Sequence, residues 1–236
     1  MARKPTSLSP ERARGAVPAN ARERLGQQTR ERVLAVATEL VLRSSVSAMA
    51  ISEVVRAARV PASSIYWHFG SKEGLVAAVA AAAVDRWLAL LPEPQALPAT
   101  GEDRVVAGIA GITRALALDP RAVPLVIKVG VELGEGKHSA LEVVRRARAA
   151  VIEYGVRVFG PAFQSLSERE ARSAAERMSA LLMATADGIA VNAAIHGRST
   201  AVLSEYESLG ELALLLYGAE AARRVARRQP SAKRGR

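Results

Sequence analysis

The sequence predicts an all-α protein of about nine helices. Apolar residues recur with the 3.6-residue period of a helix along most of the 236 residues, and no stretch alternates apolar and polar residues over the length of a strand. Half of the residues are hydrophobic but only 4% are aromatic, so the core must consist mainly of Ala, Val, Leu and Ile. A chain of this length forms one large domain or two modest ones.

Four helices are predicted before residue 92, and they differ greatly in length. Thr29 is expected to cap the first, on which Val33 and Ala37 share one face. The next two are very short and flank the tight turn at 59–61, and Ser71 is expected to cap a longer one. A medium helix followed by two very short ones has the proportions of a tri-helical helix-turn-helix unit. The expected bounds are about 29–44, 51–58, 62–68 and 72–91.

Five further helices are predicted after a linker that contains Pro92, Pro94 and Pro98. Ser167 and Glu170 have the spacing of a capping box, in which the two side chains satisfy the first backbone N–H groups of a helix. The expected helices cover about 103–118, 121–134, 138–158, 168–196 and 200–217.

Both ends of the chain are basic, unlike the part between them. The net charge is +4 over residues 1–26 and +7 over 223–236, which leaves −1 for residues 27–222. Because the two ends offer little apolar surface to bury, we expect a disordered basic arm at 1–26 and a disordered basic tail at 223–236. They either add sequence-independent attraction to phosphates or act only as solubilising tails.

The composition also excludes several classes of site. The chain has no Cys, so it has no disulfide, no thiolate zinc site and no cysteine nucleophile. Its longest uninterrupted apolar run, residues 75–84, falls short of the ~20 residues that span a bilayer, and the N-terminus lacks the apolar segment of a secretory signal. We therefore expect a cytoplasmic protein without a membrane partner, a metal or a cofactor.

The third predicted helix carries the chemistry of a nucleic-acid contact. It begins with the small residues Ala62, Ser63 and Ser64, which permit close approach to base edges and phosphate oxygens. Three of the nine aromatic residues follow within four positions. Consecutive side chains on a helix point in different directions, so at least one of Tyr66 and Trp67 is expected to face outward.

Residues 29–79, and above all the stretch SSIYWHFGSKEGL, resemble the DNA-binding domain of the tetracycline-repressor (TetR) family of transcriptional regulators. The resemblance implies a helix-turn-helix domain over 27–87, followed by a helical effector-binding and dimerisation domain over 88–222. It also implies that Phe69 fills the core, and that Tyr66 and Lys72 contact phosphates. The DNA-facing residues that it implies are Thr29, Arg30, Ser52, Ala62, Ser63, Ser64, Tyr66, Trp67, His68 and Lys72.

The sequence departs from the family pattern at the caps and at the turn. Arg59 stands where the turn usually carries Gly, so either this residue adopts a positive φ or the turn is reshaped. Ala50 and Pro61 replace the capping residues of the second and third helices, and Ser44 or Ser45 replaces the Gly that ends the first. Since each cap contributes about 1 kcal/mol, these losses predict a DNA-binding domain that is less stable by ~1–3 kcal/mol.

Members of this family dimerise through their last two long helices, which correspond here to about 168–196 and 200–217. The second of these is rich in leucine, and the first has small residues at Ala184, Gly188 and Ala194 that permit close helix approach. A symmetric four-helix interface is one interpretation. The other is that the leucine stripe belongs to the core of a single chain.

The resemblance also implies a small-molecule effector whose identity the sequence does not give. Apolar candidates for its pocket are accompanied by three candidate polar anchors, although each residue alone is more often an ordinary core or surface residue. The candidates are Trp87, Tyr154, Phe159, Met178 and Met183, with His138, Asp187 and Asn192 as the anchors.

We therefore predict a homodimeric, sequence-specific regulator that binds a palindromic operator in double-stranded DNA, a repressor released by its effector. One alternative is a sequence-blind nucleic-acid-binding protein driven by its basic tails. The other is a helical enzyme, which would have to use His68, His138 or His196. No motif for a metalloprotease, a serine hydrolase or a phosphate-binding loop is present, so we expect no enzymatic activity.

Overall fold

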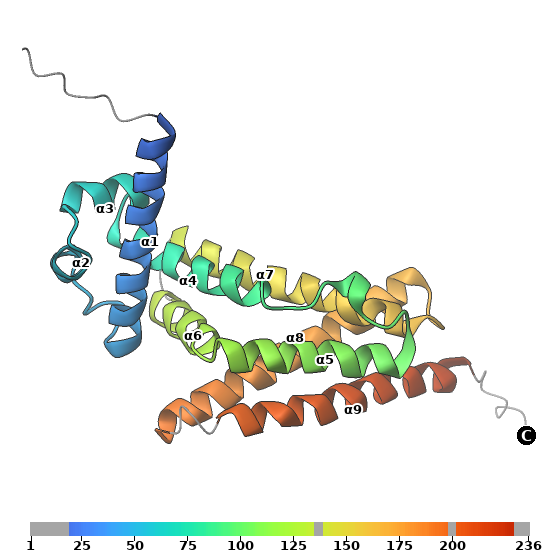
Figure 1. Ribbon diagram of the computed structural model, residues 1–236. Helices are drawn as coiled ribbons and strands as arrows, with labels where there is room; N and C mark the ends of the chain where they lie inside the picture. Colours follow the sequence, from blue (N-terminus) through green and yellow to red (C-terminus); the bar gives the residue numbers. More distant parts are fainter. Residues whose placement is uncertain (1–18, 135–138, 198–201, 229–236) are drawn as a thin grey trace, which may run out of the picture.

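The computed structural model describes residues 19–134, 139–197 and 202–228. This part of the chain contains nine α-helices, two short 3-10 helices and no strand, which confirms the all-α expectation (Figure 1). The helices are α1 (Ala19–Arg43), α2 (Ile51–Ala58), α3 (Ala62–Phe69), α4 (Lys72–Leu88), α5 (Gly101–Leu118), α6 (Ala122–Leu133), α7 (Ser139–Phe159), α8 (Glu168–Ile195) and α9 (Val202–Arg228).

Residues 19–79, here called the head, form the compact unit from which α4 leads into the rest of the molecule (Figure 1). The face of α1 predicted from its period is buried, with Val33, Ala37 and Val41 fully inaccessible. These residues pack with Val54 of α2 and Ile65 of α3 in one cluster. The head thus forms around a small aliphatic core, as the scarcity of aromatic residues requires.

The first and last helices extend further than predicted. The arm predicted over 1–26 is wrong for residues 19–26, which are helical, and the tail predicted over 223–236 is wrong for residues 223–228. Ala and Arg make up half of residues 19–26 and five of the six residues 223–228, and their high helix propensity prolongs a helix without an apolar period. Thr29 consequently lies inside α1 and is not its cap, and its hydroxyl donates to the carbonyl of Leu25 at 2.8 Å. Residues 1–18 and 229–236 lie outside the described part.

Residues 80–228, here called the body, bury a second cluster. It brings the end of α4 together with α5, α7, α8 and α9, and its largest members include Trp87, Phe159 and Tyr206. Helix α9 packs along α5 and α8, and α7 packs along α4 and α8 (Figure 1). Most of the leucines of α9 belong to this intramolecular core. Leu209 is buried, Leu212, Leu214 and Leu216 are partly buried against the core, and Leu215 is 70% exposed.

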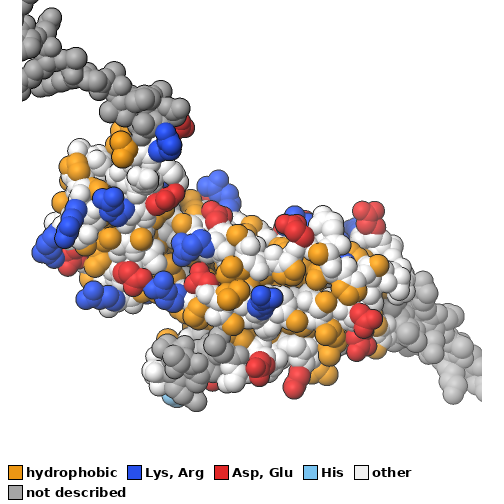
Figure 2. All heavy atoms as spheres, viewed as in Figure 1, with side chains coloured by type: hydrophobic (Ala, Val, Ile, Leu, Met, Phe, Trp, Pro, Cys, Tyr) orange, Lys and Arg blue, Asp and Glu red, His pale blue; other side chains and the backbone are white. Residues whose placement is uncertain are grey.

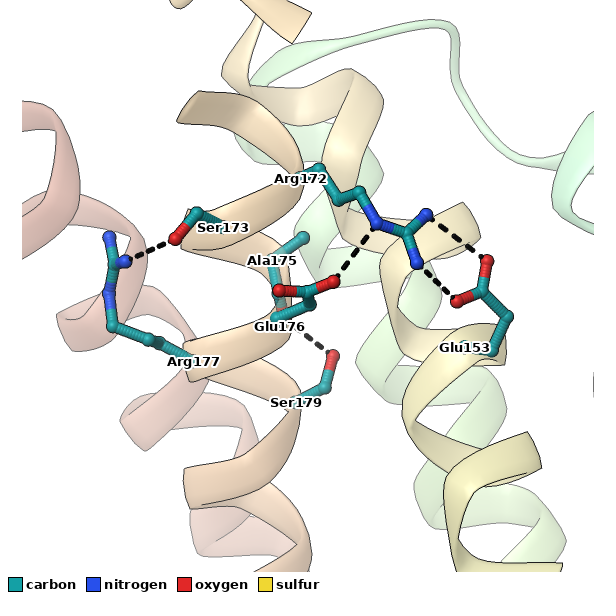
Figure 3. A network of polar contacts seen from close by, with 7 residues as sticks. All are labelled: Glu153, Arg172, Ser173, Ala175, Glu176, Arg177 and Ser179. Atoms are coloured by element: carbon teal, nitrogen blue, oxygen red, sulfur yellow. Dashed lines mark hydrogen bonds and ion pairs between the residues drawn. The ribbon is translucent and has the colours of Figure 1, made fainter. Parts of the chain in front are cut away.

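Surface ion pairs fix the register of α7, α8 and α9 (Figure 3). Arg172 of α8 lies between Glu153 of α7, at 2.7 Å, and Glu176 one turn further along α8, at 3.0 Å. The hydrogen bond from Arg172 lowers the pKa of Glu153. On the other side of α8, Arg177 pairs with Glu220 of α9 at 2.8 Å. Apart from Glu220, whose side chain is largely buried, these groups are about half exposed, so the pairs specify alignment more than they add stability.

Helix α8 is long and apolar enough to cross a membrane by length and composition alone. Core helices of globular proteins meet the same test. Here one side of α8, including Ala174, Met178 and Leu182, is buried in the body. The feature is therefore weak evidence for a membrane span.

Arg104 of α5 is a buried cation that joins three segments. Its Nε donates to the carbonyl of Val158 at 2.6 Å and one terminal nitrogen donates to that of Arg157 at 3.0 Å, so it caps the end of α7. It also donates to the carbonyls of Pro98 and Pro94 in the linker that follows α4. Burial lowers the pKa of Arg104, and the backbone carbonyls compensate for its lost hydration.

We expect Arg104→Met to lower the free energy of unfolding by about 3–5 kcal/mol, because four carbonyls lose their donor in a dry site. Chemical denaturation followed by circular dichroism measures this loss. Arg114→Met, an exposed substitution on the same helix, is the matched control and should change stability by less than about 0.5 kcal/mol. Equal effects of the two substitutions would contradict the role assigned to Arg104.

The hydroxyl of Tyr206 is buried without a hydrogen-bond partner among the described residues. Removing it in Tyr206→Phe should therefore raise the free energy of unfolding by about 1 kcal/mol. Tyr154→Phe should lower it by about the same amount, because the Tyr154 hydroxyl donates to the carbonyl of Pro92 at 2.9 Å. Thermal unfolding at neutral pH distinguishes these opposite signs.

The loss of stability at alkaline pH provides a second test of the buried Tyr206 hydroxyl. Burial raises the pKa of Tyr206 to about 12, and the negative charges of Asp187 and Glu205 act in the same direction. The unfolded chain loses this proton near the ordinary value of ~10, so the fold loses stability as the pH rises from about 10 to 12. Tyr206→Phe should reduce that loss, and an unchanged pH profile would contradict the assignment.

Candidate DNA-binding surface and body cavity

Helix α3 lies on the surface of the head and is anchored by a single buried side chain. Ile65 is fully buried, whereas Tyr66 is 50% and Trp67 is 79% exposed. Ser63 is exposed and Ser64 is partly buried, so the small residues at the start of α3 also reach the surface. An apolar ring as exposed as Trp67 contributes nothing to the core of the head, and its surface is available to a partner.

The remaining predicted contact residues surround α3. The ring of His68 meets that of Trp67 edge to face, with 4.5 Å between the centroids. Arg30 of α1 lies over the ring of Phe69 at 5.7 Å, and Phe69 itself packs against the core as predicted. Ser52 is exposed in the first turn of α2, and Ala62 is exposed at the start of α3.

Lys72 has a structural partner in addition to its predicted role. Its ammonium group donates to the carbonyl of Ser47 at 2.7 Å, which ties the first turn of α4 to the loop before α2. Ser71 caps α4 as predicted, since its hydroxyl accepts the N–H of Gly74 at 3.0 Å. An ammonium group has three donors, so the bond to Ser47 leaves Lys72 able to donate to a phosphate as well.

The turn between α2 and α3 keeps its shape in spite of the missing glycine. Arg59 adopts the left-handed conformation, with φ 54° and ψ 47°, and is the only non-glycine residue with a positive φ in the described part of the chain. The N–H of Val60 donates to the carbonyl of Val55 at 3.3 Å, and the side chain of Val60 is buried. This packing holds Arg59 in a conformation that its Cβ disfavours.

The caps that the sequence lacks are replaced only in part. Pro61 precedes α3 with an extended backbone and provides no side-chain hydrogen bond. At the start of α2, the carboxylate of Glu53 accepts the N–H of Ala50 at 3.3 Å, which supplies one half of a capping box. In the loop before α2, the hydroxyl of Ser45 accepts the N–H of Ala48 at 2.9 Å.

Basic and acidic residues are distributed unevenly along the molecule, which the net charge of residues 27–222 does not reveal. Residues 19–79 contain eight Lys and Arg against five Asp and Glu, whereas residues 80–222 contain fourteen against seventeen. The end of α9, residues 223–228, adds four Arg and no acidic residue. Figure 2 shows the basic side chains gathered over the head and the acidic ones more frequent along the body. The head therefore carries a net positive charge that attracts a polyanion, and the end of α9 carries a second one.

The body contains a cavity of about 100 Å³ that is partly open to the surface. Its wall is almost entirely apolar and is built from α4 to α9. Five of the eight residues predicted for a pocket line it, namely Trp87, Tyr154, Phe159, Met183 and Asp187.

Three predicted pocket residues do not line the cavity. Asn192 is wrong because it is exposed on α8, rotated well away from the face that carries Asp187. Met178 is buried in the body core without reaching the cavity. His138 lies outside the described residues.

The sequence reasoning missed Arg148 and Ser179, which both line the cavity. Arg148 could have been found from its helical spacing, because it shares one face of α7 with Val151 and Gly155. In the structure Arg148 forms an ion pair with Asp187 through two hydrogen bonds. The described residues contain no group of His, Asp and Glu that could hold a metal ion.

The backbone strain at Arg59 can be tested by substitution. Arg59→Gly should raise the free energy of unfolding by about 0.5–1 kcal/mol, because Gly adopts a positive φ without steric cost. Arg59→Ala is the matched control: it removes the same charge but keeps the Cβ, and it should not stabilise the protein. Thermal unfolding of both variants measures the difference, and equal stabilisation by Ala would show that charge, not backbone strain, is responsible.

Comparisons with known proteins agree with this geometry. Residues 33–79 match the family described as bacterial regulatory proteins, tetR family. No curated protein matches the chain. A TetR-family regulator from Agrobacterium tumefaciens is similar in structure, with a TM-score of 0.59 and 18% identity over 79% of this chain and 97% of that one.

Two further solved structures extend the comparison over most of the chain. A tetR-family regulator from Streptomyces coelicolor has a TM-score of 0.57 and 18% identity over 87% of this chain and 91% of its own. A transcriptional regulator from Rhodococcus sp. Rha1 has a TM-score of 0.56 and 21% identity over 80% and 94%. Residues 33–79 thus match the tetR family of bacterial regulatory proteins, and the chain shares the overall fold of solved TetR-type transcriptional regulators.

Proposed function

We propose that this protein is a homodimeric, sequence-specific DNA-binding transcriptional regulator of the cytoplasm, a repressor that a small molecule bound in the body cavity releases from its operator. It is a regulator and not an enzyme. The observation that carries the proposal is the exposure of Tyr66 and Trp67 on α3, a short helix held to the head only by Ile65 and its partly buried neighbours.

Helix α3 has the features of a helix that enters a major groove. Ser63 at its start is small enough to approach base edges, and the hydroxyl of Tyr66 is a donor suited to a phosphate. The ring of Trp67 offers apolar surface to a thymine methyl group. The excess of basic residues in the head supplies the attraction to the phosphate backbone.

The dimer is supported by an exposed apolar stripe on α8. Leu181, Val191 and Ile195 recur with helical spacing and are 51%, 43% and 74% exposed. Ala184 and Gly188 lie on the same face, and a Cβ at Gly188 would meet no atom within 4 Å. A second copy packed on this stripe would cover it and set two α3 helices on successive major grooves, ~10 base pairs apart.

Release by a ligand is supported by the elements that reach both the head and the cavity. Helix α4 begins directly after α3, and its residues Val84 and Trp87 line the cavity. Helix α6 contributes Val126 to the cavity, and its Glu132 accepts the N–H of Val46 in the loop between α1 and α2 at 2.5 Å. A ligand that displaces α4 or α6 would therefore move the head.

We expect the protein to retard a palindromic DNA fragment from its own upstream region in a gel shift, in preference to scrambled DNA. Trp67→Ala should weaken this binding at least tenfold, about 1.4 kcal/mol, without lowering the melting temperature. Leu118→Ala, which alters an exposed apolar residue of α5, is the matched control and should bind as the unaltered chain does.

Equal affinity for the palindrome and for scrambled DNA would contradict sequence-specific recognition. A chain truncated to residues 27–222 tests the alternative that the basic ends provide the binding. Retention of the preference assigns specificity to the head, whereas complete loss of binding would favour the sequence-blind alternative.

A further inference from the structure

We infer that Arg59, in the turn between α2 and α3, donates to a backbone phosphate of DNA at the border of the major groove that α3 enters. The inference rests on the proposed function, in which α3 contacts DNA, and adds a contact outside the residues predicted to face DNA. A contact of this kind strengthens binding to every DNA sequence and fixes the position of α3 in the groove.

The first observation is that Arg59 has a strained backbone and a side chain that the fold does not use. Its φ of 54° and ψ of 47° are values that glycine adopts without steric cost. The burial of Val60 depends on the shape of this turn, and a glycine at position 59 would give the same shape. The side chain of Arg59 is exposed and forms no hydrogen bond or ion pair with any described residue. Because strained residues collect at functional sites, we assign this side chain to a partner outside the chain.

The second observation is a local excess of positive charge. Arg56, three residues before Arg59, is also exposed and also lacks a side-chain partner among the described residues. The acidic residue of α2, Glu53, is engaged elsewhere, since its carboxylate accepts the N–H of Ala50 at 3.3 Å. Arg56 already places a cation in the last turn of α2, where the helix dipole favours one, so the dipole does not account for a second cation at Arg59. Two neighbouring guanidinium groups repel each other and together attract an anion.

The third observation is the position of Arg59 next to the start of α3. Arg59 precedes Ala62, the first residue of α3, by three residues, and both Ala62 and Ser63 are exposed. Consecutive Cα atoms are ~3.8 Å apart, so those of Arg59 and Ala62 lie within about 11 Å of each other. The major groove is about 12 Å wide, so a phosphate at its border is within reach of Arg59 when the start of α3 lies in the groove. Figure 2 shows basic side chains at the outer edge of the head, where α2 and α3 meet in Figure 1.

The chemistry of arginine at this position suits a phosphate. A guanidinium group can donate two parallel hydrogen bonds to the oxygens of one phosphate, and it stays charged at every physiological pH. The small residues Ala62 and Ser63 leave the base edges accessible to α3 itself. Since every nucleotide carries a phosphate, the contribution of Arg59 is expected to be the same on any DNA sequence.

The experiment titrates the full chain by fluorescence anisotropy with two duplexes, the palindromic fragment from its upstream region and a scrambled fragment of the same length. Arg59→Gly and Arg59→Ala should each lower the affinity for both duplexes at least tenfold at about 50 mM salt. Between about 50 and 200 mM salt, the slope of log affinity against log salt concentration should become shallower by about 1.8, because a dimer loses two phosphate contacts of ~0.9 each. Arg59→Lys keeps the charge and should retain the slope, with a loss of affinity below about threefold.

The two neutral variants separate the side chain from the backbone. Arg59→Gly relieves the strain and Arg59→Ala does not, so their stabilities differ, but both lack the guanidinium and should lose the same affinity. Unfolding cannot explain a loss in Arg59→Gly, because this variant is expected to be more stable than the unaltered chain. Arg114→Gln removes one positive charge from an exposed position of α5 in the body and is the control; it should change the affinity by less than about twofold.

Four results would overturn the inference: unchanged affinity and slope in both neutral variants, a loss in only one of them, an equal loss in Arg114→Gln, or a loss confined to the palindrome. The last of these would assign Arg59 to a base contact.

The unaltered chain separates this inference from the proposed function. A preference for the palindrome that does not depend on Arg59 overturns only the phosphate contact. Equal binding of the two duplexes that still depends on Arg59 overturns only sequence-specific recognition. If neither duplex binds, both are overturned.

Discussion

Helix α4 is the element on which the arrangement of the whole molecule depends, because it belongs to both cores. Its first half places Leu75 and Val79 in the core of the head, and its end places Trp87 in the core of the body. Helix α6 reinforces this link by adding Leu125 and Val129 to the core of the head. The head therefore does not close on itself, and part of its interior is supplied by residues far along the chain. Any shift of α4 against the body must be accommodated by both cores at once.

Patterns among neighbouring residues were sufficient to predict the short helices α2 and α3 of the head. The bounds of α2 follow from its apolar period. The lack of Gly at position 59 left two alternatives, a positive φ at Arg59 or a reshaped turn, and the structure shows the first. The adjacency of Tyr66 and Trp67 predicted that at least one ring faces outward, since a helix cannot bury two consecutive bulky rings on one face, and both are exposed. In each case, neighbours within a few residues determine the outcome.

Features that depend on distant parts of the chain could not be predicted in this way. Arg104 resembles any surface arginine of an amphipathic helix until the carbonyls of Pro94 and Val158 are brought to it. Most of the apolar candidates line the cavity because large side chains collect in cores, whereas Asn192 lies on the surface because polarity alone does not indicate which way a helix face turns. The start of α1 at Ala19 depends on the helix propensity of residues that have no apolar period, and helix propensity alone is a weak predictor.

The close contact between α7 and α8 has a consequence for how such a cavity can change. A Cβ at Gly155 would lie 2.2 Å from the hydroxyl oxygen of Ser179, so the two helices approach as they do because one methyl group is missing. Both residues line the cavity, and neither takes part in the pairing of Arg148 with Asp187. A larger side chain at position 155 combined with a smaller one at position 179 would change the shape of the cavity while its charged residues stay in place. Substitutions at these two positions thus offer a short route to a differently shaped cavity that leaves the head unchanged.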